Sequence, residues 1–308
     1  MKIKKTEEII FKALMYISVA FITSSLFLFV LSIFYKGLPS MSWEMISQTP
    51  KGGFYFGKEG GILNAIIGSL YLSIGATIIA MLFGIPIALF INVYLKKYNR
   101  FVNGIRFFLD ILWGIPSIVY GAFGFTIMIM LGIKTSLLAG IITVSIFILP
   151  IMVRALDEVL KTVPNGLFEA SLSLGSTRTE TAFKVFIRQT VPGLATAILL
   201  SFGRAIGDAA SVLFTTGYTD HIPTSIMQPT ATLPLAIFFQ LGSPIEEVRC
   251  RAYSSALILT IIILLISVIS RYISSKYNKH RIKFWYEFKN WHNKPEFIYR
   301  ETANIEKY

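Results

Sequence analysis

The sequence predicts an all-α, polytopic membrane protein, built as a bundle of six transmembrane helices. Of its 308 residues, 54% are hydrophobic and 15% are charged, and the mean hydropathy is +0.63. An ordinary soluble domain carries about 25% charged residues. The sequence contains several apolar blocks that reach the length of roughly 20 residues that a helix needs to cross the hydrocarbon core. Backbone groups in lipid must be satisfied within the segment, and the sequence lacks the alternating segments of a barrel, so helices are the expected structure.

Six apolar blocks pass this length criterion, and each is expected to form one span. The first follows a basic start, MKIKK, but its apolar run is too long for a signal peptide and no small-residue cleavage site follows it. We therefore interpret it as a retained helix. Pro86, Pro116 and Pro150 fall inside spans and are expected to kink them. The spans run approximately over Ile9–Tyr35, Ile62–Tyr94, Phe107–Met130, Leu137–Val159, Val191–Gly217 and Tyr253–Ile273.

Lysine and arginine gather in alternate loops, and this pattern predicts the orientation. Because positive residues concentrate on the cytoplasmic side, both termini and the loop between the fourth and fifth spans are predicted to be cytoplasmic. The net charge of +12 follows from the same bias, so membrane lipid is the expected neighbour and no nucleic-acid partner is expected. The basic residues are Lys2, Lys4 and Lys5; Lys96, Lys97, Arg100 and Arg106; Arg154, Lys161, Arg178, Lys184 and Arg188; and those from Arg271 onward.

Three segments are predicted to face outward: Lys36–Gly61, Leu131–Ser136 and Tyr218–Ala252. The last of them contains an apolar run, Leu233–Leu241, that is too short to cross the membrane. We expect this run to form a re-entrant or surface-lying helix. It is either a docking surface or a plug that covers the bundle.

The cytoplasmic loop between the fourth and fifth spans is polar but carries helical patterns. Pro164 and Asn165 make a turn, after which apolar residues recur at helical spacing until Gly175 interrupts them. A second stretch, Thr179–Gln189, has the same periodicity and leads to Pro192, a residue tolerated at a helix start. The loop is expected to hold two short helices with an exposed apolar stripe. Such a stripe favours docking in a partner's groove over the alternative of a solvated connector.

The fifth span is chemically unusual because Arg204 and Asp208 lie in an otherwise apolar segment at i and i+4. On a continuous helix these two residues would share a face. Ionisable residues inside a span normally face the bundle interior or a wet pathway, and a guanidinium fork matches the oxygens of an anion. The pair is interpreted as part of a translocation pathway. The alternative is a permanent ion pair at an interface with another subunit.

The residues of metal, redox and nucleotide chemistry are scarce in this sequence. The single cysteine, Cys250, excludes an internal disulfide, and the three histidines, His221, His280 and His292, show no ligand spacing. No GxxxxGK[ST] loop occurs, so ATP binding by the usual phosphate cradle is not expected. Neither a catalytic residue nor a cofactor nor a metal is predicted, and the chain is not expected to be an enzyme.

Two other polar segments have simpler interpretations. Arg154, Asp157 and Glu158 at the end of the fourth span are expected to anchor it at the membrane interface. The tail, residues 274–308, mixes basic and aromatic residues as segments at anionic headgroups do, and it is either an interfacial appendage or disordered.

The loop Glu169–Pro192, which reads EASLSLGSTRTETAFKVFIRQTVP, resembles the EAA coupling loop of ABC-importer permeases. One departure is Ser171, where many such loops have alanine. The resemblance implies the type I permease fold of ABC importers and a loop that docks on an ATPase subunit. The residues that match the skeleton of the loop are Glu169, Ala170, Gly175, Ile187 and Pro192.

Three further stretches are similar to phosphate-specific permeases. They are WGIPSIVYGAFG (Trp113–Gly124), FGRAIGDAASVLFTTG (Phe202–Gly217) and SIMQPTATLPLAIF (Ser225–Phe238), the last resembling the PstA type in particular. Related permeases usually have glutamate where this chain has Asp208. The resemblance implies a permease subunit of an ATP-driven phosphate importer. The alternatives are a permease for another oxyanion, such as molybdate or sulfate, and an ATP-independent secondary transporter, which would be expected to show internal repeats or a chain of intramembrane charges.

The resemblance also implies the partners and the location of the chain. The partners are a PstC-like second permease subunit, two PstB-like ATP-binding subunits and a PstS-like extracytoplasmic phosphate-binding protein. The location is the plasma (inner) membrane of a bacterium or archaeon. Three regions are expected: an N-terminal helix and outward loop (1–61), a permease core (62–273) with its coupling helix at 164–190, and a cytoplasmic tail (274–308).

Overall fold

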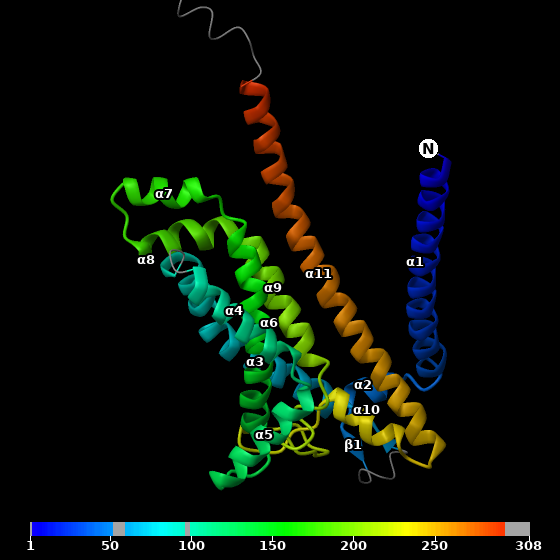
Figure 1. The fold of residues 1–308 in the computed structure, drawn as a ribbon. Helices are drawn as coiled ribbons and strands as arrows, with labels where there is room; N and C mark the ends of the chain where they lie inside the picture. The colour runs from blue at the N-terminus through cyan, green and yellow to red at the C-terminus, as the bar shows by residue number, and fades with distance from the viewer. Residues whose placement is uncertain (1, 52–58, 96–98, 293–308) are drawn as a thin grey trace, which may run out of the picture. The chain divides into compact units, whose positions relative to one another are not determined.

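The computed structural model describes residues 2–51, 59–95 and 99–292, and the described chain is predominantly helical (Figure 1). A pair of two-residue antiparallel strands, β1 (Pro50–Lys51) and β2 (Glu59–Gly60), is the small addition to the predicted all-α fold. The helices are α1 (Lys2–Gly37), α2 (Trp43–Ser47), α3 (Leu63–Leu89), the π-helix η1 (Phe90–Tyr94), α4 (Asn99–Gly114), α5 (Ser117–Met130), α6 (Leu137–Lys161), α7 (Asn165–Ser173), α8 (Arg178–Glu180), the π-helix η2 (Thr181–Ile187), α9 (Arg188–Ile206), α10 (Leu233–Leu241) and α11 (Glu246–His292).

Within the described residues, five helices are long and apolar enough to cross a membrane, and α4 with α5 makes a sixth if the pair is one broken span. The predicted helical membrane fold is thus confirmed. The third span differs from the expected kinked helix, because α4 ends at Gly114 and α5 begins after Pro116. Proline disfavours helical backbone at the preceding residue, here Ile115, which explains a full break.

The fifth span also differs from the prediction at both ends. One helical run extends from Arg178 to Ile206, so Pro192 lies inside a helix rather than at a helix start. Membrane helices tolerate internal proline where the freed carbonyl finds another partner. The run ends eleven residues earlier than expected, and the segment up to Gly217 forms turns.

The last helix, α11, is longer than the predicted span Tyr253–Ile273 and runs through His292. The predicted tail, 274–308, therefore begins inside this helix, while residues 293–308 lie outside the described part. Lys96 and Lys97, which the orientation argument uses, and residues 52–58 of the first outward loop also lie outside it.

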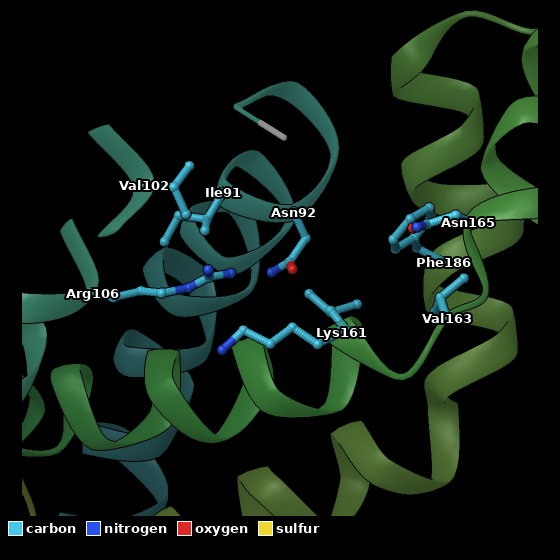
Figure 2. A pocket seen from close by; sticks show the side chains of 9 residues that line it. Ile91, Asn92, Val102, Arg106, Lys161, Val163, Asn165 and Phe186 are labelled. Atoms are coloured by element: carbon cyan, nitrogen blue, oxygen red, sulfur yellow. The ribbon is translucent and has the colours of Figure 1, made fainter. Parts of the chain in front are cut away.

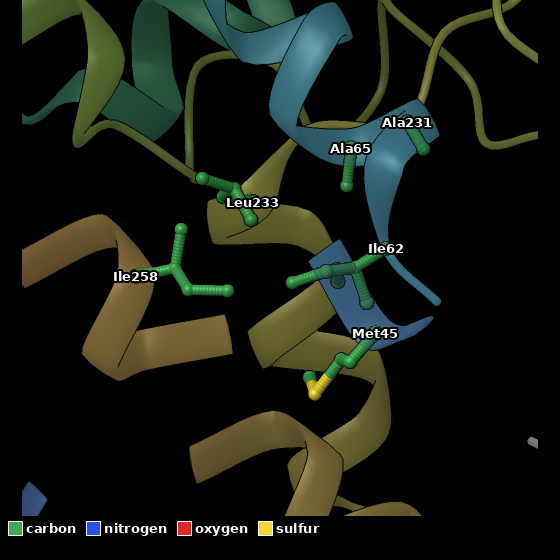
Figure 3. Close-up of a cluster of buried hydrophobic side chains, with 7 residues drawn as sticks. Met45, Ile62, Ala65, Ala231, Leu233 and Ile258 are labelled. Carbon is green, nitrogen blue, oxygen red and sulfur yellow. The ribbon is translucent and has the colours of Figure 1, made fainter. Parts of the chain in front are cut away.

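The chain divides into two compact units. The first comprises residues 1–76, 115–147 and 204–264, and the second comprises 77–114, 148–203 and 265–308. Each unit has its own apolar cluster. In the first, side chains of α2, α3, α10 and α11 and of the residues just before α3 and α10 meet (Figure 3): Met45, Ile62, Ala65, Ala231, Leu233, Ala236 and Ile258. In the second, the cluster contains Ile91, Val102, Leu109 and Val153.

The short helix α10 matches the predicted apolar run in the third outward loop. Its first residues are buried in the cluster of the first unit, and the hydroxyl of Ser69 on α3 accepts a hydrogen bond from the backbone N–H of Leu233 at 2.7 Å. A Cβ at Gly68 would lie 2.0 Å from the carbonyl oxygen of Ala231, so glycine is required for this close approach. The start of α10 is therefore held against α3 by packing and by a buried hydrogen bond.

Candidate functional site: a helix hairpin and the membrane arginine

The polar loop of the second unit folds as a helix hairpin, made of α7, the turn at Gly175, and the run α8–η2. Gly175 has φ of +83°, a conformation that costs little only for glycine. Thr177 starts the second arm with a capping box. Its hydroxyl accepts a hydrogen bond from the N–H of Glu180 at 3.2 Å, and the Glu180 carboxylate accepts one from the N–H of Thr177 at 3.0 Å. The predicted first short helix and its glycine break are observed, whereas the second stretch is not a separate short helix but the start of the continuous run Arg178–Ile206. Figure 1 shows α7 and α8 joined by this turn.

The two arms of the hairpin pack through their inner faces. The ring of Phe168 on α7 meets the ring of Phe186 on η2 edge-on, with centroids 6.1 Å apart, and the hydroxyls of Ser171 and Thr181 are hydrogen-bonded at 2.9 Å. Phe186, Thr181 and Ser171 are all buried. The departure from the EAA pattern at Ser171 thus has a structural use, because its hydroxyl joins the arms.

Three large apolar side chains of the hairpin are exposed. Leu174 is 86% exposed, Phe183 is 57% exposed, and Leu167 is also exposed. Large apolar side chains this accessible at one small hairpin are typical of an interaction surface. This face, defined by Leu167, Leu174 and Phe183, is called the coupling face below.

The five residues predicted for coupling divide between the arms. Glu169 and Ala170 are exposed on α7, and Gly175 forms the turn. Ile187 is half-buried at the end of η2, and Pro192 is half-buried further along in α9. Glu169 is the fifth of nine residues of α7, past the first turn, so its charge gains little from the helix dipole.

The last residue of η1, which follows α3, connects the hairpin to the rest of the second unit. The hydroxyls of Tyr94, the last residue of η1, and Thr179 are hydrogen-bonded to each other. The guanidinium of Arg178 donates to the Tyr94 carbonyl at 3.4 Å. The second arm of the hairpin therefore has a direct connection to the end of a neighbouring span.

A buried carboxylate at the end of α6 was missed by the sequence reasoning. Arg154, Asp157 and Glu158 were expected to form an interfacial anchor, but the side chain of Asp157 is 0% exposed. The guanidinium of Arg106 donates to both of its oxygens at 2.9 Å, and the amide of Asn92 donates to it at 2.8 Å. A signal was present, because residue 157 falls on the face of α6 that the buried residues at 153, 156 and 160 define.

Two further cations complete this cluster. Arg154 contacts Asp157 at 3.0 Å and also Asp110 at 2.6 Å, and Lys161 contacts Asp157 at 3.0 Å and Glu158 at 2.7 Å. A carboxylate buried this deeply is tolerated only when it is fully paired. The cluster therefore fixes α4, η1 and the end of α6 relative to one another, immediately before α7 begins.

A cavity of about 180 Å³ lies beside this cluster (Figure 2). Arg106 and Lys161 line it, but both already pair with Asp157. Asn165, the first residue of α7, and Phe186 of the hairpin line it as well, so the cavity lies at the base of the hairpin. The remaining lining residues are Ile91, Asn92, Val102, Leu160 and Val163.

The prediction that Arg204 and Asp208 share a helix face is wrong. Arg204 lies in the last turn of α9, which ends at Ile206, and Asp208 follows outside the helix. Its carboxylate accepts a hydrogen bond from the N–H of Ser211 at 2.8 Å. Aspartate competes with helix formation through this kind of local bond, and Gly203 and Gly207 weaken the helix on either side.

Arg204 is exposed, and its guanidinium lies over an aromatic ring rather than against a carboxylate. The guanidinium carbon is 5.4 Å from the centroid of Phe147 on α6. Arg204 forms no ion pair with any side chain in the described part of the structure. The structure thus separates the two predicted pathway residues into an available cation and a residue that holds a turn.

Fold and hairpin together define the class: a multi-span helical membrane protein that carries a helix hairpin with exposed apolar side chains. Comparison with known proteins identifies the family. Residues 84–283 match the family described as binding-protein-dependent transport system inner membrane component, and the chain belongs to it.

The curated relatives narrow the family further. The phosphate transport system permease protein PstA of Yersinia pestis is 34% identical over 249 residues, which is 80% of this chain and 82% of that protein. PstA of Haemophilus influenzae is 30% identical over 87% of this chain and 94% of its own length. PstA 1 of Mycobacterium tuberculosis is 34% identical over 68% of each chain.

Solved structures support the fold. A chain of the inward-facing MetNI methionine ABC transporter matches with a TM-score of 0.56 and 20% identity, over 70% of this chain and 95% of that one. A chain of a bacterial alginate ABC transporter also reaches 0.56, with 13% identity, over 88% of this chain and 95% of that one. The architecture is that of ABC-importer permeases.

Proposed function

We propose that this chain is a permease subunit of an ATP-driven importer of inorganic phosphate. Its relatives that bear the name PstA cover most of its length, which supports phosphate as the cargo. The coupling face carries the argument for ATP-driven transport. An exposed apolar face on a short hairpin needs a partner groove, as in helix-in-groove recognition.

The partners follow from this role. A PstC-like permease subunit completes the membrane pathway, two PstB-like subunits bind ATP, and a PstS-like protein delivers phosphate from outside. The coupling face docks on one ATPase subunit. The complex lies in the plasma membrane of a bacterium or archaeon, with both termini and the hairpin in the cytoplasm.

Within the pathway, we assign anion contact to Arg204. Arg204 is exposed near the end of α9, where it provides a cation in an otherwise apolar span. Asp208 has a different role from the one first expected. Because its carboxylate is bonded to the N–H of Ser211, it shapes the turn after α9.

Co-purification and transport test the proposal together. The chain, expressed with its partner subunits, is expected to retain the ATPase in detergent and to support phosphate uptake that requires ATP and the binding protein. Arg204→Ala is expected to keep the assembled complex and lose uptake, whereas Arg249→Ala, at an exposed arginine near the start of α11, should transport normally. Normal uptake by Arg204→Ala would refute the pathway assignment, and failure to recruit any ATPase would refute the importer assignment.

A further inference from the structure

We infer that Phe147 is a positioning residue for anion transfer, which holds the Arg204 guanidinium in the pathway through a cation–π contact. The inference rests on the proposed function, because it gives a role to the surroundings of the arginine proposed to meet phosphate. It concerns the first unit alone, to which both residues belong.

The two side chains differ in exposure in the way that such a role requires. Phe147 is 3% exposed on α6, so the surrounding protein fixes its ring. Arg204 is exposed, with its guanidinium carbon 5.4 Å from the ring centroid, inside the range of about 6 Å for this interaction. The buried ring is the support, and the accessible guanidinium is the part that can meet a ligand.

Neighbouring elements hold the ring in place. Tyr120 on α5 is also buried and packs against Phe147, with centroids 5.6 Å apart and planes inclined by 61°. The next residue, Gly121, lets α5 approach the turn after Asp208, because a Cβ there would lie 2.8 Å from the Ala210 carbonyl oxygen. Helices α5 and α6 and the turn that follows α9 thus meet around this ring.

An aromatic face and a carboxylate stabilise an arginine differently. A carboxylate accepts hydrogen bonds from the guanidinium N–H groups, usually from two of them. A ring face attracts the positive charge but accepts no conventional hydrogen bond from the N–H groups at the guanidinium edge. The N–H groups of Arg204 thereby stay available to the oxygens of an anion. Phe147 fixes the charge in position without competing for its donors.

A second arginine of the same chain shows the contrast. Arg106 gives its Nε and Nη2 donors to the buried Asp157, both at 2.9 Å, and is committed to a structural pair. Arg204 has a buried ring in place of the carboxylate. Arg106 is therefore arranged to hold helices together, whereas Arg204 is arranged to bind a ligand transiently.

Progressive fluorination of Phe147 tests the inference. Mono-, di- and trifluorophenylalanine weaken the negative ring face stepwise with little change in size, so packing is preserved. Phosphate uptake per assembled complex is measured in proteoliposomes with the binding protein and ATP. We expect a graded decline with each fluorine, reaching about 2- to 30-fold, the range of a cation–π contact from exposed to desolvated sites.

Two comparisons complete the experiment. Phe147→Trp should retain uptake because indole is the stronger π partner, and Phe147→Leu should lose it. The same fluorinated series at Phe214, whose ring packs against that of Phe125 with centroids 6.0 Å apart, should leave uptake unchanged.

The possible results separate the two claims. Uptake by the wild-type chain with no dependence on fluorination at Phe147 would overturn this inference and leave the proposed function intact. Absence of phosphate uptake by the assembled wild-type complex would overturn the proposed function itself. Equal declines at Phe147 and Phe214 would show a general packing effect and also refute the positioning role.

Discussion

Replacement of Asp157 by asparagine is the sharpest test of the buried charge cluster in the second unit. The carboxylate is fully buried and accepts contacts from Arg106, Arg154, Lys161 and Asn92. Asparagine has nearly the same shape, but its NH₂ group would face the cationic donors. Removing one partner of a buried ion pair costs about 3 to 5 kcal/mol, since it leaves a buried charge without compensation.

The expected change is measurable as a thermal shift. At roughly 2 to 4 °C per kcal/mol, Asp157→Asn should lower the unfolding midpoint of the purified chain in detergent by about 6 to 20 °C. The matched control is Glu158→Gln on the same helix. Glu158 contacts Lys161 at 2.7 Å, but it is 60% exposed, so its loss should cost less than about 1 kcal/mol.

A charge-balanced double variant separates the loss of pairing from the loss of shape. Asp157→Leu with Arg106→Met removes both the carboxylate and its two-bond partner, and replacing a buried pair by apolar residues is often neutral or stabilising. The double variant should therefore recover at least half of the shift seen for Asp157→Asn. Equal midpoints for Asp157→Asn and Glu158→Gln would contradict the reasoning.

Three further predictions concern the hairpin. Leu174→Glu should reduce ATPase co-purification at least about tenfold with little effect on folding, because the side chain is exposed. The same change at Ile226, which is exposed but lies outside the hairpin, should leave assembly intact. Equal ATPase binding by both variants would refute the coupling face as the docking surface. Gly175→Ala should destabilise the hairpin by about 1 kcal/mol through its positive φ alone, whereas Gly166→Ala, also with open space around its Cβ, should not, as thermal unfolding or hydrogen exchange would show. Thr177→Ala should cost about 1 kcal/mol by removing the helix cap, and unchanged hydrogen exchange in the second arm would argue against the capping box.

The helical membrane fold could be predicted because it depends on composition and on the lengths of apolar runs. The hairpin could also be predicted, since its glycine turn and its periodic stripe are local patterns. The periodicity did not show which side of each arm faces inward. Phe186 packs against Phe168, while Phe183, three residues before it, is exposed.

The errors arose where local chemistry or distant partners decide the outcome. The end of α9 was misplaced because apolar content was followed through Asp208, although aspartate beside glycine often ends a helix through a side-chain bond to the backbone. The burial of Asp157 depends on Arg106 and Asn92, which are 51 and 65 residues away along the chain. A single sequence contains no record of such pairs, although the apolar face around position 157 was visible.

Transport by the reconstituted complex tests the central claim most directly. Proteoliposomes that contain this chain with its second permease subunit and ATPase subunits would be supplied with labelled phosphate, the binding protein and ATP. Our account predicts phosphate accumulation that requires both ATP and the binding protein and that excess sulfate or molybdate does not suppress. Accumulation of one of those oxyanions instead, or phosphate flux that is independent of ATP, would contradict it.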